Sequence, residues 1–198
     1  MLTPATLAAA SGIIEATVDK HAADLLDLRR DLHAHPELAF AEHRTTGIAI
    51  ERVTEAGWRV TRHGSTGLVA EIGGVGPLVA LRADLDALPV EDTTGDPWAS
   101  TVAGVAHACG HDVHTTALLG AALALAEVHE QGVLGGRVRL LFQPAEETMP
   151  GGATMMIEQG ALREVEQIFA LHCDPSLDVG TVGLRNGPLT GASDSLDV

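Results

Sequence analysis

The chain has 198 residues, of which 45% are hydrophobic, and this is enough to bury the core of one domain. Its 12 Lys and Arg residues are outnumbered by 27 Asp and Glu residues, which gives a net charge of -15 at pH 7. Such a charge repels nucleic-acid phosphates and anionic lipids, so we expect neither nucleic acid nor a membrane as a partner. A small molecule is the expected partner.

Cysteine content and the first residues indicate the compartment. Two cysteines are too few for the disulfide framework of a small secreted domain. The segment from Met1 to Gly12 lacks the basic start of a signal peptide and contains only a short run of Ala and Leu. We therefore expect a cytoplasmic protein.

The first third of the chain is predicted to form two helices. Apolar residues recur at intervals of three to four between Ile13 and Leu32, and Pro36 lies just past the end of this run. A second helix is predicted from Thr45 to Ala56, with Gly57 as its stop signal. Both helices are expected to bury one face.

Short strands are predicted to follow. Strand character begins at Trp58 and Val60 and returns in two apolar runs, Gly67–Ile72 and Leu78–Leu81. The glycine-rich segment Gly73–Pro77 joins these runs, and its composition is typical of a hairpin connection. The two runs are therefore predicted to be neighbouring strands.

The second half of the chain alternates helices and strands. Residues Asp112–Glu130 carry an apolar stripe at helical spacing, with Asp112 as the expected N-cap. Val138–Phe142 is predicted to be a strand, Gly152–Gln159 a short helix, and Ile168–Leu171 a buried strand. This alternation predicts an α/β fold, in which helices cover both faces of a mixed, largely parallel sheet.

The segment His107–Asp112 has the composition of half a metal site. Cys109 and His111 are two positions apart, so their side chains lie on the same side of an extended turn but about 200° apart around a helix. We therefore expect the segment to be non-helical through Gly110. A thiol and an imidazole would then point towards one place.

Three predicted strands lead into further polar residues. The first is followed by Asp84 and Asp86, the second by Glu146 and Glu147, and the third by His172. Ligands of open α/β sheets collect beyond the carboxyl ends of the strands, so these exits can converge on one pocket. The start of the helix after Gly110 is expected to join them there.

These donor types indicate metal-assisted hydrolysis. A thiolate, two imidazoles and a carboxylate suit Zn²⁺, and Mn²⁺, Co²⁺ or Ni²⁺ are alternatives. Adjacent glutamates rarely point at the same atom, so one of Glu146 and Glu147 is expected to bind the metal while the other faces a bound water. A free carboxylate there can accept the proton of that water and deliver it to a leaving amine.

Each residue also has a structural interpretation. His172 alone is more often structural than a ligand, Cys109 alone can be a small buried residue, and Asp84 can turn the chain. His114, one helical turn beyond His111, is expected to have a packing or supporting role. A disulfide between Cys109 and Cys173 would remove one ligand.

Five motifs, in this order along the chain, resemble those of the aminoacylase/carboxypeptidase family of two-metal peptidases. Within it, the likeness is to N-acyl-amino-acid amidohydrolases such as hippurate hydrolase and the auxin-conjugate hydrolases. The motifs are LHAHPEL (Leu32–Leu38), LRADLDALP (Leu81–Pro89), HACGHDVH (His107–His114), FQPAEE (Phe142–Glu147) and LH (Leu171–His172). The resemblance implies a zinc-peptidase-like domain that hydrolyses the amide bond of small N-acyl amino acids.

The resemblance also implies a role for each residue of the site. Cys109, His111, Glu147 and His172 match metal ligands for one or two ions, with the cysteine able to bridge two. Glu146 matches the general acid/base. These assignments follow from the likeness and not from spacing.

Two features differ from such relatives. Asp84 matches an aspartate that supports a metal-binding histidine two residues earlier, but this chain has Arg82 there, so Asp84 is expected only to support the ligands.

Relatives are also considerably longer. Residues 1–187 are therefore expected to be the N-terminal part of the catalytic domain, incomplete on its C-terminal side. Residues 188–198 are expected to begin the connection to a lid or dimerisation domain, and the full-length protein is expected to be a homodimer. A dipeptidase or aminoacylase of the same family, or a non-catalytic metal-binding module, is the alternative.

Overall fold

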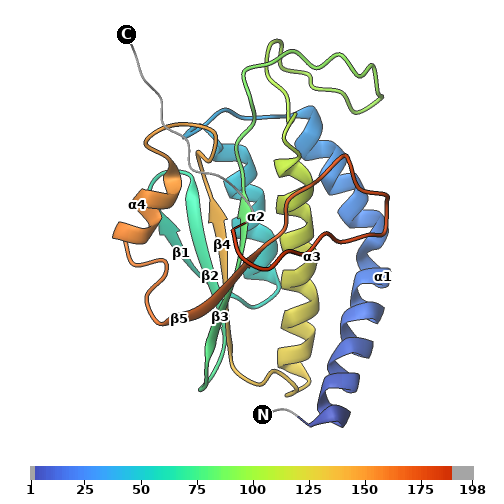
Figure 1. Cartoon of the computed structure of the whole chain (residues 1–198), viewed down its shortest axis with the longest axis vertical. Helices are drawn as coiled ribbons and strands as arrows, with labels where there is room; N and C mark the ends of the chain where they lie inside the picture. Colours follow the sequence, from blue (N-terminus) through green and yellow to red (C-terminus); the bar gives the residue numbers. More distant parts are fainter. Residues whose placement is uncertain (1–2, 189–198) are drawn as a thin grey trace.

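A five-stranded mixed sheet separates three helices on one face from a short helix on the other (Figure 1). The computed structural model describes residues 3–188, so the expected connection at 188–198 lies almost wholly outside the described residues. The elements are α1 (Pro4–Ala34), α2 (His43–Glu55), β1 (Arg59–His63), β2 (Gly67–Gly73), β3 (Leu78–Asp84), α3 (His111–Glu130), β4 (Arg137–Gln143), α4 (Gly152–Glu158) and β5 (Val165–Ala170). Within residues 3–188, no helix is long and apolar enough to span a bilayer.

Successive side chains of β4 point to opposite faces of the sheet and contribute to a hydrophobic core on each face. Phe142 faces α1, α2 and α3, where it is fully buried with Leu32 and Leu119. Leu141 points to the opposite face and packs with Met156 of α4. Each such buried side chain stabilises the fold by about 1.5 to 3 kcal/mol. The predicted α/β class, with helices on both faces of the sheet, is confirmed.

The first helix is longer than its apolar pattern predicts. It begins at Pro4, and the Thr3 hydroxyl caps it by accepting the N–H of Thr6 at 3.2 Å. Its buried residues are confined to the C-terminal end, at Leu28, Leu32 and His33. The early turns are mostly exposed, which is why their amphipathic signal is weak.

The predicted hairpin between β2 and β3 is wrong. The strand order is β1-β2-β4-β3-β5, so β4 lies between them, antiparallel to β2 and parallel to β3. Most residues of β4 are buried, which favours a central place in the sheet. A glycine-rich turn reverses the chain but does not make the two strands neighbours; the true hairpin joins β1 and β2, where His63 pairs with Gly67.

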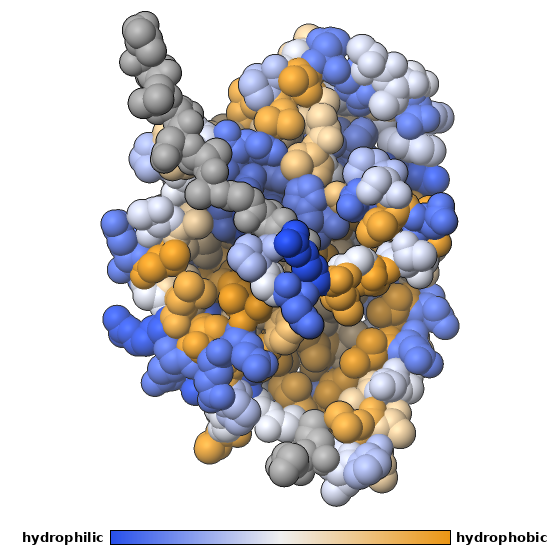
Figure 2. All heavy atoms as spheres, viewed as in Figure 1, coloured by the Kyte–Doolittle hydropathy of each residue, from blue (hydrophilic) through white to orange (hydrophobic). Residues whose placement is uncertain are grey.

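The prediction of a buried last strand is also wrong. In the described sheet β5 pairs only with β3, and Ile168, Phe169 and Leu171 are 48%, 56% and 68% exposed. Figure 2 shows apolar side chains gathered on the face where Figure 1 places β5. An apolar run predicts a core strand, but its burial depends on neighbours that the run does not encode.

Asp112 is not the N-cap of α3. Gly110, at φ 82°, holds that position, and a left-handed φ of this kind favours glycine. The Asp112 carboxylate is buried and instead accepts a hydrogen bond from His33 Nδ1 at 2.8 Å and forms an ion pair with Arg29 Nε at 3.0 Å. It thereby ties the start of α3 to the end of α1, which runs beside it in the opposite direction (Figure 1).

Candidate metal centre

The sheet topology brings the predicted site residues to one edge of the sheet. Strands β4, β3 and β5 are mutually parallel, so their carboxyl ends lie at the same edge. Asp84 ends β3, Glu146 and Glu147 follow β4, and His172 follows β5. The first residue of α3, His111, reaches the same edge because its Nδ1 lies 2.8 Å from the carbonyl oxygen of Asp86.

The donor atoms of these segments lie close together. Cys109 Sγ is 3.4 Å from His172 Nε2, and His111 Nε2 is 3.7 Å from Glu147 Oε1. Among residues 3–188, three groups have donor atoms within 4.8 Å of one another, and His111 belongs to all of them. The groups are Cys109/His111/His172, His111/Glu146/Glu147 and Asp84/His111/His114.

His111 offers a buried, unused nitrogen to this cluster. Its Nδ1 donates to a backbone carbonyl, which can only accept, so the lone pair of the neutral ring lies on Nε2. Nε2 is buried and has no hydrogen-bond partner among the described residues. A buried polar atom left unpaired is costly, and a cation at this place would satisfy it.

The charges around His111 also favour a cation. Burial alone would lower the pKa of His111, but the hydrogen bond to Asp86 and the negative charges of Asp84, Asp86 and Glu147 outweigh it and raise the pKa. The site thus stabilises one positive charge on this ring. A metal ion would supply positive charge in the same place.

The same acidic surroundings disfavour ionisation of the Cys109 thiol. Burial and the neighbouring carboxylate of Glu147 raise the pKa of its thiol to about 12. A thiolate would form here only if a cation balanced the carboxylates. Cys109 and Cys173 are both free thiols, so the structure does not contain the disulfide that would remove a ligand.

Asp86 fixes the loop that carries the two glutamates. Its carboxylate is 1% exposed and accepts the backbone N–H groups of Glu146 at 2.9 Å and Glu147 at 3.0 Å. Despite burial, these bonds and that of His111 lower the pKa of Asp86. From the sequence, Asp86 is predicted only to follow a strand. Its position two residues beyond Asp84 was the one indication that it supports the site.

The Asp84 carboxylate contacts His114 of α3 and Arg82 of its own strand. Its carboxylate accepts a hydrogen bond from His114 Nδ1 at 2.7 Å and forms an ion pair with Arg82 Nη1 at 2.7 Å. Burial opposes ionisation, yet these partners lower the pKa of Asp84 to about 2. Arg82 is occupied by this pair and by Gln143, to which its Nε donates at 3.0 Å.

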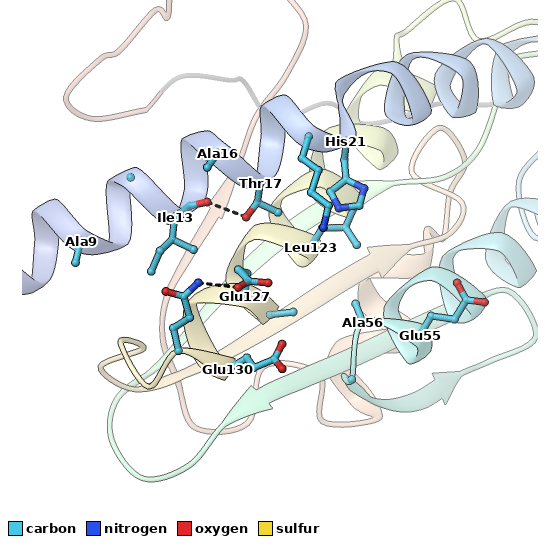
Figure 3. Close-up of a pocket in the computed structure, with 15 residues that line it drawn as sticks. Ala9, Ile13, Ala16, Thr17, His21, Glu55, Ala56, Leu123, Glu127 and Glu130 are labelled. Atoms are coloured by element: carbon cyan, nitrogen blue, oxygen red, sulfur yellow. Dashed lines mark hydrogen bonds between the residues drawn. The ribbon is translucent and has the colours of Figure 1, made fainter.

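A broad groove elsewhere on the domain is distinct from this centre. Figure 3 shows it between α1, α3 and the end of α2, lined by Ile13, His21, Ala56, Leu123 and Glu127 among others. Leu123 is twelve residues along α3 from the first residue of that helix, which corresponds to about 18 Å. The groove therefore does not belong to the donor cluster.

The fold is α/β, and thiol, imidazole and carboxylate donors lie at the ends of its parallel strands. This combination defines a metallopeptidase-like hydrolase domain. Cys109, His111 and His172 lie within metal-binding distance of one another, as do His111, Glu146 and Glu147, and these thiol, imidazole and carboxylate donors suit a divalent transition metal. The chain belongs to peptidase family M20/M25/M40, whose sequence pattern matches residues 80–189.

Comparison with individual relatives agrees with this family. Over 176 residues the chain is 54% identical to a protein of Rhodococcus jostii (strain RHA1) named as a candidate glutamate–cysteine ligase 2-3, covering 88% of this chain and 22% of that protein. Over 177 residues it is 49% identical to the N-acetyl-L-cysteine deacetylase of Bacillus subtilis (strain 168), covering 88% of this chain and 42% of that protein.

A solved structure shows the same fold. The crystal structure of the Bacillus subtilis YXEP protein, described as a dinuclear metal binding peptidase from the M20 family, matches with a TM-score of 0.79 and 44% identity. The match covers 84% of this chain and 47% of that one. The chain thus spans less than half the length of each of these three relatives.

Proposed function

We propose that the chain is the metal-binding part of an amidohydrolase that splits the amide bond of small N-acyl amino acids into a carboxylate and a free amino acid. The convergence of two donor groups on His111, one with Cys109 and His172 and the other with Glu146 and Glu147, is the observation that carries the proposal. Membership of the M20 family and the deacetylase activity named for one relative support it.

The proposed ligands are those four residues, and Glu146 is the proposed general acid/base. A divalent ion bound there would supply Lewis acidity towards the scissile carbonyl and the attacking water. The Glu146 carboxylate would accept a proton from that water and deliver it to the leaving amine. Asp86 holds the backbone N–H groups of both glutamates, and the Glu146 carboxylate lies within 4.8 Å of donor atoms of His111 and Glu147.

The identity and number of ions are part of the proposal. We propose one or two ions of Zn²⁺, Mn²⁺, Co²⁺ or Ni²⁺. A thiolate such as that of Cys109 can bridge two neighbouring ions, and the YXEP structure is described as dinuclear. Anomalous scattering at each metal absorption edge would identify the ion and its occupancy.

Further proposals concern the longer protein. We propose that residues 1–187 are the first part of a catalytic domain, that the complete protein is a cytoplasmic homodimer, and that its partner is the small-molecule substrate. Two free thiols support a reducing compartment. Sedimentation of the complete protein and its distribution between cell fractions would test these points.

The decisive experiment combines metal content with turnover. The chain is purified, loaded with Zn²⁺ or Mn²⁺, and assayed for release of free amino acid from N-acetyl-L-cysteine and a panel of N-acetyl and N-benzoyl amino acids. We expect the chain to bind metal and to release amino acid weakly or not at all by itself, and the full-length protein to release it in a reaction that a chelator abolishes. Dipeptides in the same panel distinguish a dipeptidase.

One alternative is favoured by the short span of the chain relative to its relatives. The chain covers 42% of the deacetylase, so it can be a metal-binding module that does not complete turnover. A metal-loaded chain that stays inactive even when the missing half is supplied would support this alternative, whereas activity restored by that half would support the amidohydrolase proposal. A chain that binds no metal would contradict both.

A further inference from the structure

We propose that His114 is a positioning residue that holds His172 at the metal centre through the backbone of Cys173, and is not itself a ligand. The inference rests on the proposed metal centre and adds to it a support for the one proposed ligand that follows β5. His114 comes from the first turns of α3, 59 residues before Cys173 in the chain. The contact thus ties a segment beyond the last strand to a buried helix.

Both ring nitrogens of His114 are already used. Its Nδ1 lies 2.7 Å from Oδ1 of Asp84, and its Nε2 lies 2.8 Å from the backbone nitrogen of Cys173. A backbone N–H can only donate, so Nε2 must carry the lone pair and Nδ1 the proton. The carboxylate of Asp84 accepts that proton and so fixes this tautomer. At 5% exposure, the ring exchanges neither partner easily for water.

The backbone of Cys173 connects His114 to His172. The backbone N–H of Cys173 is held by His114, and its carbonyl oxygen lies 2.7 Å from His172 Nδ1. His172 Nδ1 must donate to that carbonyl, which leaves Nε2 with its lone pair, 3.4 Å from Cys109 Sγ. A continuous series of contacts therefore runs from Asp84 through His114 and Cys173 to the two donor atoms.

His172 needs such a support because its own segment supplies little. The described residues after Ala170 form neither helix nor strand, and His172 is exposed. The His114 ring lies against the His172 ring, with centroids 4.9 Å apart. Gly110 lets the segment approach, since a Cβ there would lie 3.2 Å from both Cβ and Sγ of Cys173.

Ligation by His114 is the competing interpretation. Asp84, His111 and His114 have donor atoms within 4.8 Å of one another. Binding a metal through Nε2 would release the Cys173 N–H, and binding through Nδ1 would break the bond to buried Asp84. Either change would free the backbone that orients His172, so the same residue cannot serve both roles.

The test uses two substitutions of His114, each of which keeps one of the two hydrogen bonds of its ring. His114→Gln places an amide oxygen near the position of Nε2 and can still accept the Cys173 N–H. His114→Asn can still donate to Asp84 but does not reach Cys173. Amide hydrogen exchange of residues 171–175 is measured in the metal-free chain, with the amides of α3 as the internal control for folding.

We expect exchange of the Cys173 amide to accelerate by about tenfold or more in His114→Asn, because the part-buried hydrogen bond of that amide is lost, and far less in His114→Gln. The α3 amides should keep their protection in both. Unchanged exchange at Cys173 in His114→Asn would overturn the proposal. This arm needs no metal, so it stands even if the proposed metal centre fails.

A second arm measures Zn²⁺ binding by calorimetry, with His172→Asn as the reference for a lost ligand. We expect His114→Asn to weaken Zn²⁺ binding by about 10- to 100-fold, as for loss of a residue that supports a ligand, and His114→Gln to bind more tightly than His114→Asn. If both His114 variants lose Zn²⁺ as completely as His172→Asn while Cys173 stays protected, His114 is a ligand. Failure of the unaltered chain to bind Zn²⁺ would contradict the proposed function alone.

Discussion

Two pairs of acidic residues follow neighbouring parallel strands and have opposite surroundings. Asp84 and Asp86, at the end of β3, are each 1% exposed, and their carboxylates accept hydrogen bonds from His114, Glu146 and Glu147. The glutamates that follow β4 are exposed, and towards Asp86 they contribute only their backbone N–H groups.

The difference shows how one type of side chain takes two roles at one site. A buried carboxylate is tolerated only with full hydrogen bonding, so the aspartates are committed to holding the structure around them. The glutamates keep their carboxylates available for a cation or a proton. Four acidic groups of similar chemistry thus divide, according to burial, into a supporting pair and a pair for which we propose a reacting role.

The largest expected effect separates the two glutamates from each other. Glu146→Gln removes the proposed proton carrier but no proposed ligand, so turnover should fall by about 10²- to 10⁴-fold while metal content is unchanged. Glu147→Gln should instead lose metal. Amino-acid release and metal analysis of both variants give the answer. Equal loss of metal from the two would show that this division of labour is wrong.

The next prediction tests whether Asp86 supports the loop that carries the two glutamates. Asp86→Asn leaves one acceptor oxygen for two backbone N–H groups and places an amide N–H against one of them. We expect Zn²⁺ binding to weaken by about 10- to 100-fold through displacement of the glutamate loop. Asp27→Asn, at a carboxylate whose side chain is 80% exposed, is the matched control and should bind as the unaltered chain does. Unaltered affinity in Asp86→Asn would remove Asp86 from the supporting pair.

A smaller effect concerns the pH dependence of stability in the metal-free chain. The pKa of Asp84 is lowered from its ordinary 3.8 to about 2, so its contribution is present above pH 3.8 and is lost as the pH falls towards 2. The difference corresponds to about 2 kcal/mol. Urea unfolding at a series of pH values should show this acid-dependent loss in the unaltered chain and not in Asp84→Asn. Parallel pH profiles for the two proteins would contradict the assignment.

The smallest expected effect is on an exposed ion pair away from the site, which serves as a reference for the buried aspartates. Asp24 forms a two-bond ion pair with Arg52 at 2.6 Å and 2.9 Å, but their side chains are 45% and 34% exposed. Asp24→Asn should therefore lower the free energy of unfolding by less than about 1 kcal/mol, and less still at high salt. A loss as large as that of Asp84→Asn would mean that burial is not what distinguishes the supporting aspartates.

The sequence was sufficient to predict that the site segments converge. Hydrophobic runs end just before Asp84, Glu146 and His172, and parallel strands bring their ends to one edge, so the convergence follows from local pattern and topology. The non-helical turn through Gly110 was likewise predictable from the spacing of Cys109 and His111.

The remaining features depend on tertiary partners. Asp112 has the residue type of an N-cap, but it is turned inward by Arg29 and His33 of another helix. The exposure of Phe169 depends on the absence of a second neighbour for β5 within the described sheet. The two contacts of His114 could not be derived from helical spacing, since one partner lies 30 residues before it and the other 59 residues after it.

The placement of His172 directly beyond β5 has a kinetic consequence. In the described sheet β5 is held by β3 alone, whereas Cys109 and His111 lie at the start of a buried helix. Under the proposed ligand set, fraying of this strand would carry one donor away while the others stay in place. The lifetime of the bound ion would then depend on how often this edge strand opens and on the His114–Cys173 contact that ties the segment after it to α3.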